Sequence, residues 1–99
     1  IQKLMKQAQQ MQAGMQKTQE ELANKNVEAS VGGGKVTVVA NGAGDVQSIR
    51  IDPSVVDPAD VEFLQELVLS GVQEAVTKGK EMAAAEMSKL TGGLGLPGM

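Results

Sequence analysis

Hydrophobic positions recur near the start of the chain at alternating spacings of three and four residues. Such a repeat places them along one side of a helix, as in a coiled-coil contact. The repeated positions are Ile1, Leu4, Ala8, Met11, Met15, Thr18 and Leu22. Because Asn24 to Asn26 interrupt the pattern, the sequence predicts a helix over about residues 1–25. Gly14 inside it either costs up to ~1 kcal/mol relative to alanine or permits the close approach of a second helix.

From Val27 onward the hydrophobic positions alternate with polar ones, which predicts β-strands. Three such segments, residues 27–31, 35–40 and 46–51, are rich in β-branched residues. Gly32 to Gly34 separate the first two segments, and Asn41 to Asp45 separate the last two. Asn and Gly favour tight turns. The sequence therefore predicts a three-stranded antiparallel meander.

A second helical pattern follows Asp52-Pro53, which ends the sheet. Asp57 is expected as the N-cap and Pro58 as the first helical residue. The apolar pattern continues to about residue 90, and Gly92-Gly93 end it. The expected fold is α+β, with the order α-β-β-β-α and the meander flanked by two long helices. Residues 1–91 form the single domain, and residues 92–99 form a flexible Gly/Leu/Pro tail.

The predicted helices are much longer than the predicted strands. Helices of about 25 and 34 residues span roughly 37 and 50 Å, whereas a strand of six or seven residues spans roughly 20–23 Å. Both helices should overshoot the sheet that they cover, and residues 1–17 and 76–90 should project as an antiparallel pair. The residues expected to face one another are Ile1, Leu4, Met11 and Met15 from the first helix and Ala75, Met82, Ala83, Met87 and Leu90 from the second.

Composition narrows the chemistry that 99 residues can carry. The chain has one aromatic residue, Phe63, and no cysteine or histidine, so the usual general base and thiolate chemistry are missing. We expect no enzymatic activity, no cofactor, no metal site and no small-molecule substrate. No apolar run approaches the ~20 residues that cross a bilayer, so we expect a cytoplasmic protein without membrane contact. The thin core favours a homodimer. Since the sequence begins at Ile1, we expect a few residues to precede it.

Charge is distributed unevenly along this chain of net charge −3. Residues 1–19 carry three lysines, seven glutamines and no acid, whereas residues 45–74 carry seven acids against Arg50 alone. The projecting pair would hold six lysines against Glu81 and Glu86, a local charge of +4. These lysines are Lys3, Lys6, Lys17, Lys78, Lys80 and Lys89. A basic element on an acidic protein indicates an anionic partner.

Three segments together resemble the YbaB/EbfC family of bacterial nucleoid-associated proteins. They are Leu4 to Gln12 (LMKQAQQMQ), Asn41 to Pro53 (NGAGDVQSIRIDP) and Lys89 to Met99 (KLTGGLGLPGM). The resemblance implies a tweezer-like homodimer whose projecting helices grip double-stranded DNA with little sequence preference, in nucleoid organisation and gene regulation. It assigns DNA contact to the six lysines above. The seam between the helices, or between two copies, would be formed by Leu4, Met11, Met15, Met82 and Met87.

Other interpretations of the same residues remain open. Gly32-Gly33-Gly34-Lys35 is similar to part of a phosphate-binding loop, but its place between two strands favours a hairpin turn. The acids Asp57, Asp60 and Glu62 could form a metal site, but helix capping and solubility explain them better. An alternative function is a protein-interaction adaptor that uses the apolar seam and the tail. Partners that persist after nuclease treatment of a lysate would favour the adaptor.

Overall fold

The computed structural model describes residues 1–92, and the side chains of residues 1–90. Helix α1 (Gln2–Ala23) is followed by strands β1 (Asn26–Val31), β2 (Val36–Asn41) and β3 (Val46–Ile51), a short 3-10 helix η1 (Pro53–Val55) and helix α2 (Val61–Gly92). The predicted order α-β-β-β-α is confirmed. Apart from Gly92, the last residue of α2, the predicted tail lies outside the described residues.

The three strands form an antiparallel sheet in the order β1-β2-β3. Its first turn consists of Gly32, Gly33 and Gly34, which all have positive φ, between 64° and 87°. Side chains other than glycine rarely adopt this conformation. The hairpin interpretation of this segment is therefore confirmed, and the resemblance to a phosphate-binding loop is superficial.

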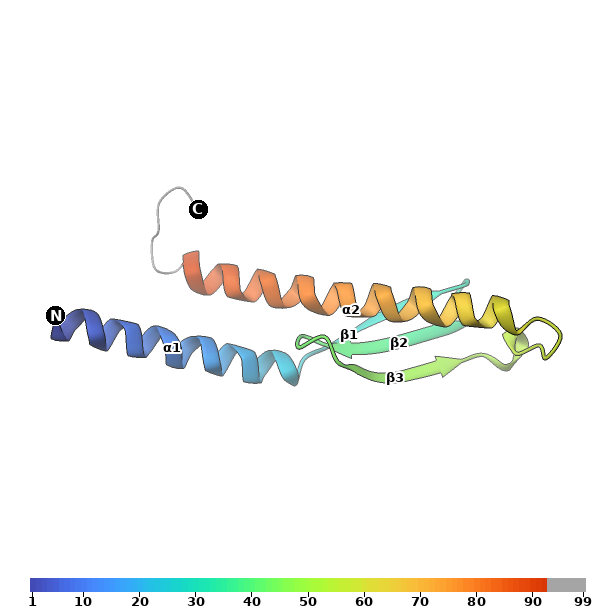
Figure 1. The fold of residues 1–99 in the computed structure, drawn as a ribbon, viewed down its shortest axis with the longest axis horizontal. Coiled ribbons are helices and arrows are strands. Elements are labelled where there is room, and N and C mark those ends of the chain that lie inside the picture. Colours follow the sequence, from blue (N-terminus) through green and yellow to red (C-terminus); the bar gives the residue numbers. More distant parts are fainter. Residues whose placement is uncertain (93–99) are drawn as a thin grey trace.

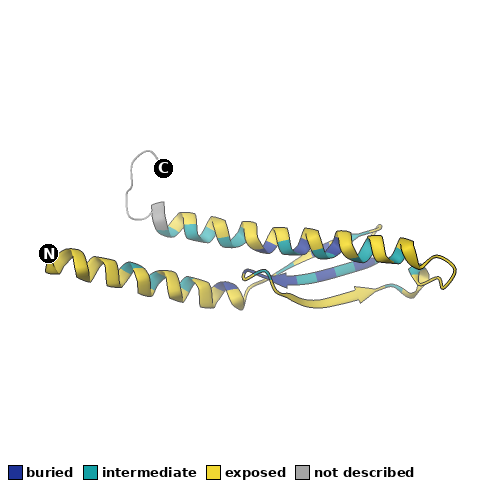
Figure 2. Cartoon of the chain, in the orientation of Figure 1, coloured by how far each residue is buried: buried dark blue, intermediate teal, exposed yellow. Residues whose placement is uncertain are grey.

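One face of the sheet carries the hydrophobic core. Val36 and Val38 of β2 are completely buried there. The register places Ala29 of β1 opposite Val38, on the same face. Helix α2 covers this face (Figures 1 and 2). Its Ala75 has 0% exposure. The core is thus made of small and β-branched side chains.

Helix α2 approaches the sheet closely at Gly79. A Cβ atom on this residue would collide with the backbone carbonyl of Asn41 at the end of β2. Glycine is required here because it brings no side chain between the helix and the strand. The crossing also marks where the sheet ends beneath α2, and the helix continues beyond it to Gly92. The molecule is consequently elongated, with extents of 68 × 25 × 16 Å.

Helix α1 lies beyond the end of the sheet, beside the C-terminal part of α2 (Figure 1). We had expected both helices to cover the sheet and to overshoot it. Only α2 does so, because the chain leaves α1 at Ala23 and enters β1 at Asn26. A connection of two residues leaves no room for α1 to fold back over a sheet face. Almost the whole of α1 therefore projects.

The beginning of α2 differs from its prediction. Asp57 accepts a hydrogen bond from the amide of Ala59 (2.9 Å) and organises a turn, so it does not cap the helix. Asp60 accepts from the amide of Phe63 (3.3 Å), and the helix begins at Val61. The predicted cap was therefore one turn too early, since Asp57 and Asp60 are equally competent N-caps in the sequence.

Candidate nucleic-acid interface

The projecting part of the molecule, here called the prong, consists of α1 and residues 80–92 of α2. Its helices pack side by side along a seam. At the base, Leu22 is buried beside Met87 and Ala83. Nearer the tip, a Cβ on Gly14 would lie 3.7 Å from Cδ1 of Leu90, which is an ordinary van der Waals contact, so the helices meet here without requiring glycine.

The residues predicted for the seam differ in their exposure. Met11, Met82 and Met87 are half-buried in the prong, whereas Met15 is 39% exposed and Leu4 69% exposed. Ile1, at 94% exposure, also has no cover among the described residues. Ala75 was wrongly assigned to the pair, because it belongs to the sheet core. The prong seam therefore narrows toward the beginning of α1.

The prong is joined to the sheet through Asn41, whose buried side chain makes three hydrogen bonds. Its Nδ2 donates to the carbonyl of Ala23 at the end of α1 (3.0 Å). Its Oδ1 accepts from the amides of Ala43 (3.0 Å) and Asp45 (2.9 Å) in the β2–β3 turn. The amide of Gly42 adds a bond to the carbonyl of Leu22 (2.9 Å). The sequence showed Asn41 only as a turn residue. Its Asn-Gly pair gave no sign of the contact with α1.

Three lysines of α1 form a stripe on one lateral face of the prong. Lys3, Lys6, Gln10 and Lys17 are separated by three, four and seven residues, which places them on one side of the helix. Lys3, Gln10 and Lys17 each directly precede a residue of the seam repeat, so the stripe is turned about 100° away from the seam. All four side chains are exposed. We call Lys3, Lys6 and Lys17 the lysine stripe.

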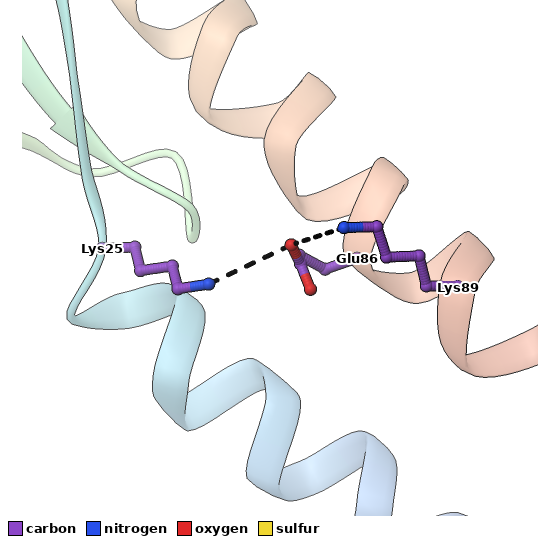
Figure 3. A network of polar contacts seen from close by, with 3 residues as sticks. All are labelled: Lys25, Glu86 and Lys89. Carbon is purple, nitrogen blue, oxygen red and sulfur yellow. Dashed lines mark ion pairs between the residues drawn. The ribbon is translucent and has the colours of Figure 1, made fainter.

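The three predicted lysines of α2 are also exposed, but each lies beside another part of the protein. Lys78 lies over the sheet, and its Nζ donates to the carbonyl of Glu28 in β1 (3.0 Å). The Cε of Lys80 lies 3.6 Å from the position that a Cβ on Gly44 would occupy, in the β2–β3 turn. Lys89 pairs with Glu86 (3.6 Å), which also lies 4.0 Å from Lys25 just after α1 (Figure 3).

The structure therefore changes the predicted distribution of charge. Lys78 is not part of the prong, and residues 80–92 contain two lysines and two glutamates, a net charge of zero. The positive charge of the prong lies on residues 1–19, which carry three lysines and no acid. At the sheet end of α1, Glu20 and Glu21 add two negative charges. The expected charge of +4 spread over both helices is therefore wrong, and the net positive charge is confined to the outer part of α1.

The carboxylates of the described residues do not cluster as the ligands of a metal ion. Among residues 1–92, no group of three or more metal-ligating side chains is close enough to hold an ion. The hydrogen bond from the Ser54 amide lowers the pKa of Asp52, and Lys35 at 3.6 Å contributes, which stabilises the turn after β3. No helix in this part of the chain is long and apolar enough to cross a membrane.

Comparison with known proteins decides the family. The sequence pattern of the YbaB/EbfC DNA-binding family matches residues 1–94. The chain belongs to this family. A nucleoid-associated protein of Ruminiclostridium cellulolyticum is 59% identical over 97% of this chain and 84% of its own length. One of Acetivibrio thermocellus is 59% identical over 100% of this chain and 88% of its own length.

The YbaB/EbfC fold is also seen in a crystal structure. The uncharacterized protein HP0035 from Helicobacter pylori matches with a TM-score of 0.67 and 22% sequence identity, over 81% of this chain and 93% of that chain. At this identity the match concerns the fold alone. Family membership confirms the resemblance seen in the three sequence segments.

Proposed function

We propose that this protein binds double-stranded DNA through the lysine stripe of α1, with little sequence preference. The observation that carries the proposal is a row of exposed lysines on a projecting helix, in a stretch (residues 1–19) that contains no acid. Lys3 and Lys17 are 14 residues apart, or about 21 Å along a helix. The stripe is therefore long enough to follow a phosphate backbone over several base pairs.

The lysine stripe would contact phosphates. Each lysine that neutralises a phosphate releases condensed counterions, so log K falls with log salt with a slope of about −0.9 per contact. Contacts to phosphates carry no sequence information directly, which agrees with weak sequence preference. Because curated relatives are named nucleoid-associated proteins, we extend the proposal to a bacterial protein of the nucleoid that takes part in its organisation and in gene regulation.

We propose further that two copies associate through an uncovered apolar surface at β3. Ile49 pairs with Val38 and Ile51 with Val36, so both lie on the core face of the sheet. Yet they are 44% and 37% exposed, because α2 packs over β1 and β2. Val46, opposite Ala40, is 39% exposed on the same face.

The flank of α2 extends this surface. Leu69, Val72, Val76 and Lys80 follow one side of the helix by their spacing. Since Lys80 lies against the β2–β3 turn, this side faces β3. Leu69 is 57% exposed there. A dimer formed through β3 and this flank would carry two prongs, and hence two lysine stripes, able to contact one duplex.

A matched pair of variants tests the DNA contact. Lys3→Gln/Lys17→Gln removes two charges from the stripe, and Gln12→Glu/Gln16→Glu makes the same change in net charge on the opposite lateral face of α1. We expect the first variant to weaken binding and to make the salt slope shallower by about 2 per prong. The second should retain the wild-type slope. Equal slopes in both variants and the wild type would reject the stripe as the binding surface.

A second pair tests the association. Ile49→Glu places a charge in the proposed surface, whereas Ser48→Glu places it on the other face of the same strand. Sedimentation should show a dimer for the wild type and Ser48→Glu, and a monomer for Ile49→Glu. A monomeric wild type, or a dimeric Ile49→Glu, would contradict the proposed surface.

A further inference from the structure

The joint between the prong and the sheet contains an asparagine followed by a glycine, Asn41-Gly42. Asn-Gly is a chemically labile pair, because glycine has no side chain to restrict its backbone or to hinder attack by its own nitrogen. The Gly42 nitrogen attacks Cγ of Asn41, and the side-chain nitrogen leaves as ammonia, which gives a cyclic succinimide. Water then opens the ring to aspartate or isoaspartate. The joint therefore holds the reactants of a spontaneous deamidation.

The fold requires both residues at this place. Asn41 is 4% exposed, and its side chain donates one hydrogen bond and accepts two. A Cβ on Gly42 would lie 2.8 Å from both the Cβ and the carbonyl oxygen of Leu22, so no side chain fits there. The packing of α1 against the β2–β3 turn thus places the labile pair at the joint itself.

The closed joint holds the reacting groups apart. The Gly42 amide donates to the carbonyls of Leu22 (2.9 Å) and Lys25 (3.1 Å), so its N–H is directed toward the end of α1. The Asn41 amide group is fixed by the Ala23 carbonyl and by two turn amides. Cyclisation requires the Gly42 nitrogen to lose its proton and to approach Cγ, which breaks these bonds. The reaction is blocked until the joint opens.

We propose that Asn41-Gly42 is a deamidation site that reacts through an open joint, in which the end of α1 has separated from the β2–β3 turn. Local openings of this kind require less free energy than global unfolding. Leu22 is the only buried residue of α1, so few apolar contacts oppose the separation. Neither DNA binding nor the dimer takes part in the reaction.

Deamidation would prevent the joint from closing as before. The aspartate product has an oxygen in place of Nδ2, and a carboxylate oxygen cannot donate to the Ala23 carbonyl. Two acceptors then face one another in a buried site, which is unfavourable. In the isoaspartate product the backbone also gains a methylene group between β2 and the turn. The prong is therefore loosened in every chain that has reacted.

Peptide mass spectrometry after timed incubation measures the reaction. In guanidinium chloride, Asn41 should deamidate much faster than Asn24 and Asn26, which are followed by Lys25 and Val27. In the folded wild type, Asn41 should react at least about ten times more slowly than in the denaturant, because only the open fraction reacts. Equal rates in the folded and the unfolded chain would overturn the proposal.

A matched pair of truncations separates opening of the joint from global unfolding. Leu22→Ala removes apolar contacts at the joint, whereas Val38→Ala removes them from the core of the sheet. Leu22→Ala should deamidate several times faster than the wild type, and Val38→Ala should stay close to the wild-type rate. Equal acceleration in both would show that global unfolding exposes the pair, and no acceleration in Leu22→Ala would show that the joint does not protect it. Either result would overturn the proposal.

Limited proteolysis tests the loosened joint. Lys25 lies between α1 and β1, and its carbonyl is held by Gly42, so cleavage by trypsin after Lys25 requires the joint to open. Asn41→Asp, which reproduces one product, should be cleaved there several times faster than the wild type. Gln47→Glu makes the same exchange of amide for carboxylate on exposed β3 and should be cleaved at the wild-type rate. Equal cleavage of Asn41→Asp and the wild type would overturn the loosening.

Discussion

The two ends of this molecule differ in how they are stabilised. The sheet and the first half of α2 enclose a core in which Val36, Val38 and Ala75 have no exposure at all. In the prong, the only buried residue of α1 is Leu22, at its base. The buried core of the sheet end can therefore stabilise the fold, whereas α1 in the prong carries the positive charge. Substitutions at the two ends should separate stability from binding.

The largest effect is expected at the joint between the two regions. Asn41→Ala would remove three hydrogen bonds and leave the Ala23 carbonyl and two turn amides without their partner. Buried groups left this way cost 1–3 kcal/mol each, and we expect a loss of about 3 kcal/mol in total. Urea denaturation at one fixed protein concentration measures it. Asn24→Ala, which removes an exposed 3.1 Å bond to the Glu20 carbonyl, is the control and should cost under about 1 kcal/mol. Similar losses in both would contradict the importance of the joint.

Replacing glycine by alanine should change protein stability in opposite directions in the two regions. Gly79→Ala drives a methyl group into the Asn41 carbonyl and should destabilise the protein by about 2 kcal/mol. Gly14→Ala meets Leu90 at an ordinary 3.7 Å and should stabilise the protein by up to about 1 kcal/mol through helix propensity. Urea denaturation measures the change in stability of both variants. Destabilisation of equal size at both positions would show that the prong is packed as tightly as the sheet.

Lysines in the two regions should differ in their contribution to DNA binding. Lys17→Gln removes one phosphate contact and should reduce the salt slope by about 0.9 per prong. Lys78→Gln loses an exposed bond to the Glu28 carbonyl and should leave the slope unchanged. Fluorescence anisotropy with a labelled duplex at several salt concentrations measures both. A greater effect of Lys78→Gln on the salt slope would indicate that DNA contacts the region near β1 and not the prong.

The smallest effect concerns pH at the far end of the sheet. The pKa of Asp52 is lowered from 3.8, mainly by the Ser54 amide. The carboxylate therefore adds stability above its unfolded pKa, and this contribution is lost as the pH falls through the lower folded pKa. Asp52→Asn should be slightly less stable than the wild type at pH 7, and the difference should be smaller at a pH below 3.8. Denaturation midpoints at the two pH values measure it, and a constant difference would contradict the assignment.

The local patterns in the sequence predicted the elements well because each has a strong local signal. Alternating β-branched residues marked the strands, and the 3-4 repeat marked α1. The positions of the helices relative to the sheet depend on contacts between distant residues. The close approach of Gly79 to the Asn41 carbonyl sets where α2 leaves the sheet. No local pattern in the sequence shows this contact. Lys78 was therefore counted on the wrong side of that boundary.

The lysine stripe was accessible to sequence reasoning, since spacing alone places Lys3, Lys6 and Lys17 on one side of a helix. What could not be predicted was which lysines would be engaged inside the protein. The Lys89–Glu86 pair, three residues apart, follows from helix spacing, but the carbonyl that Lys78 contacts is 50 residues away. Likewise, the acceptor of the Asn41 amide group is 18 residues distant, at Ala23.

Helix α2 passes without interruption from the sheet into the prong, as a single element of 32 residues. A rigid rod that is clamped along one half behaves mechanically as a lever. A sideways load on the tip would be felt at Gly71 and Gly79, where the helix rests on β2. Displacing the prong therefore requires bending α2 or shifting it on β2. Its orientation is inherited from the sheet, and any partner that forced it aside would have to strain the core.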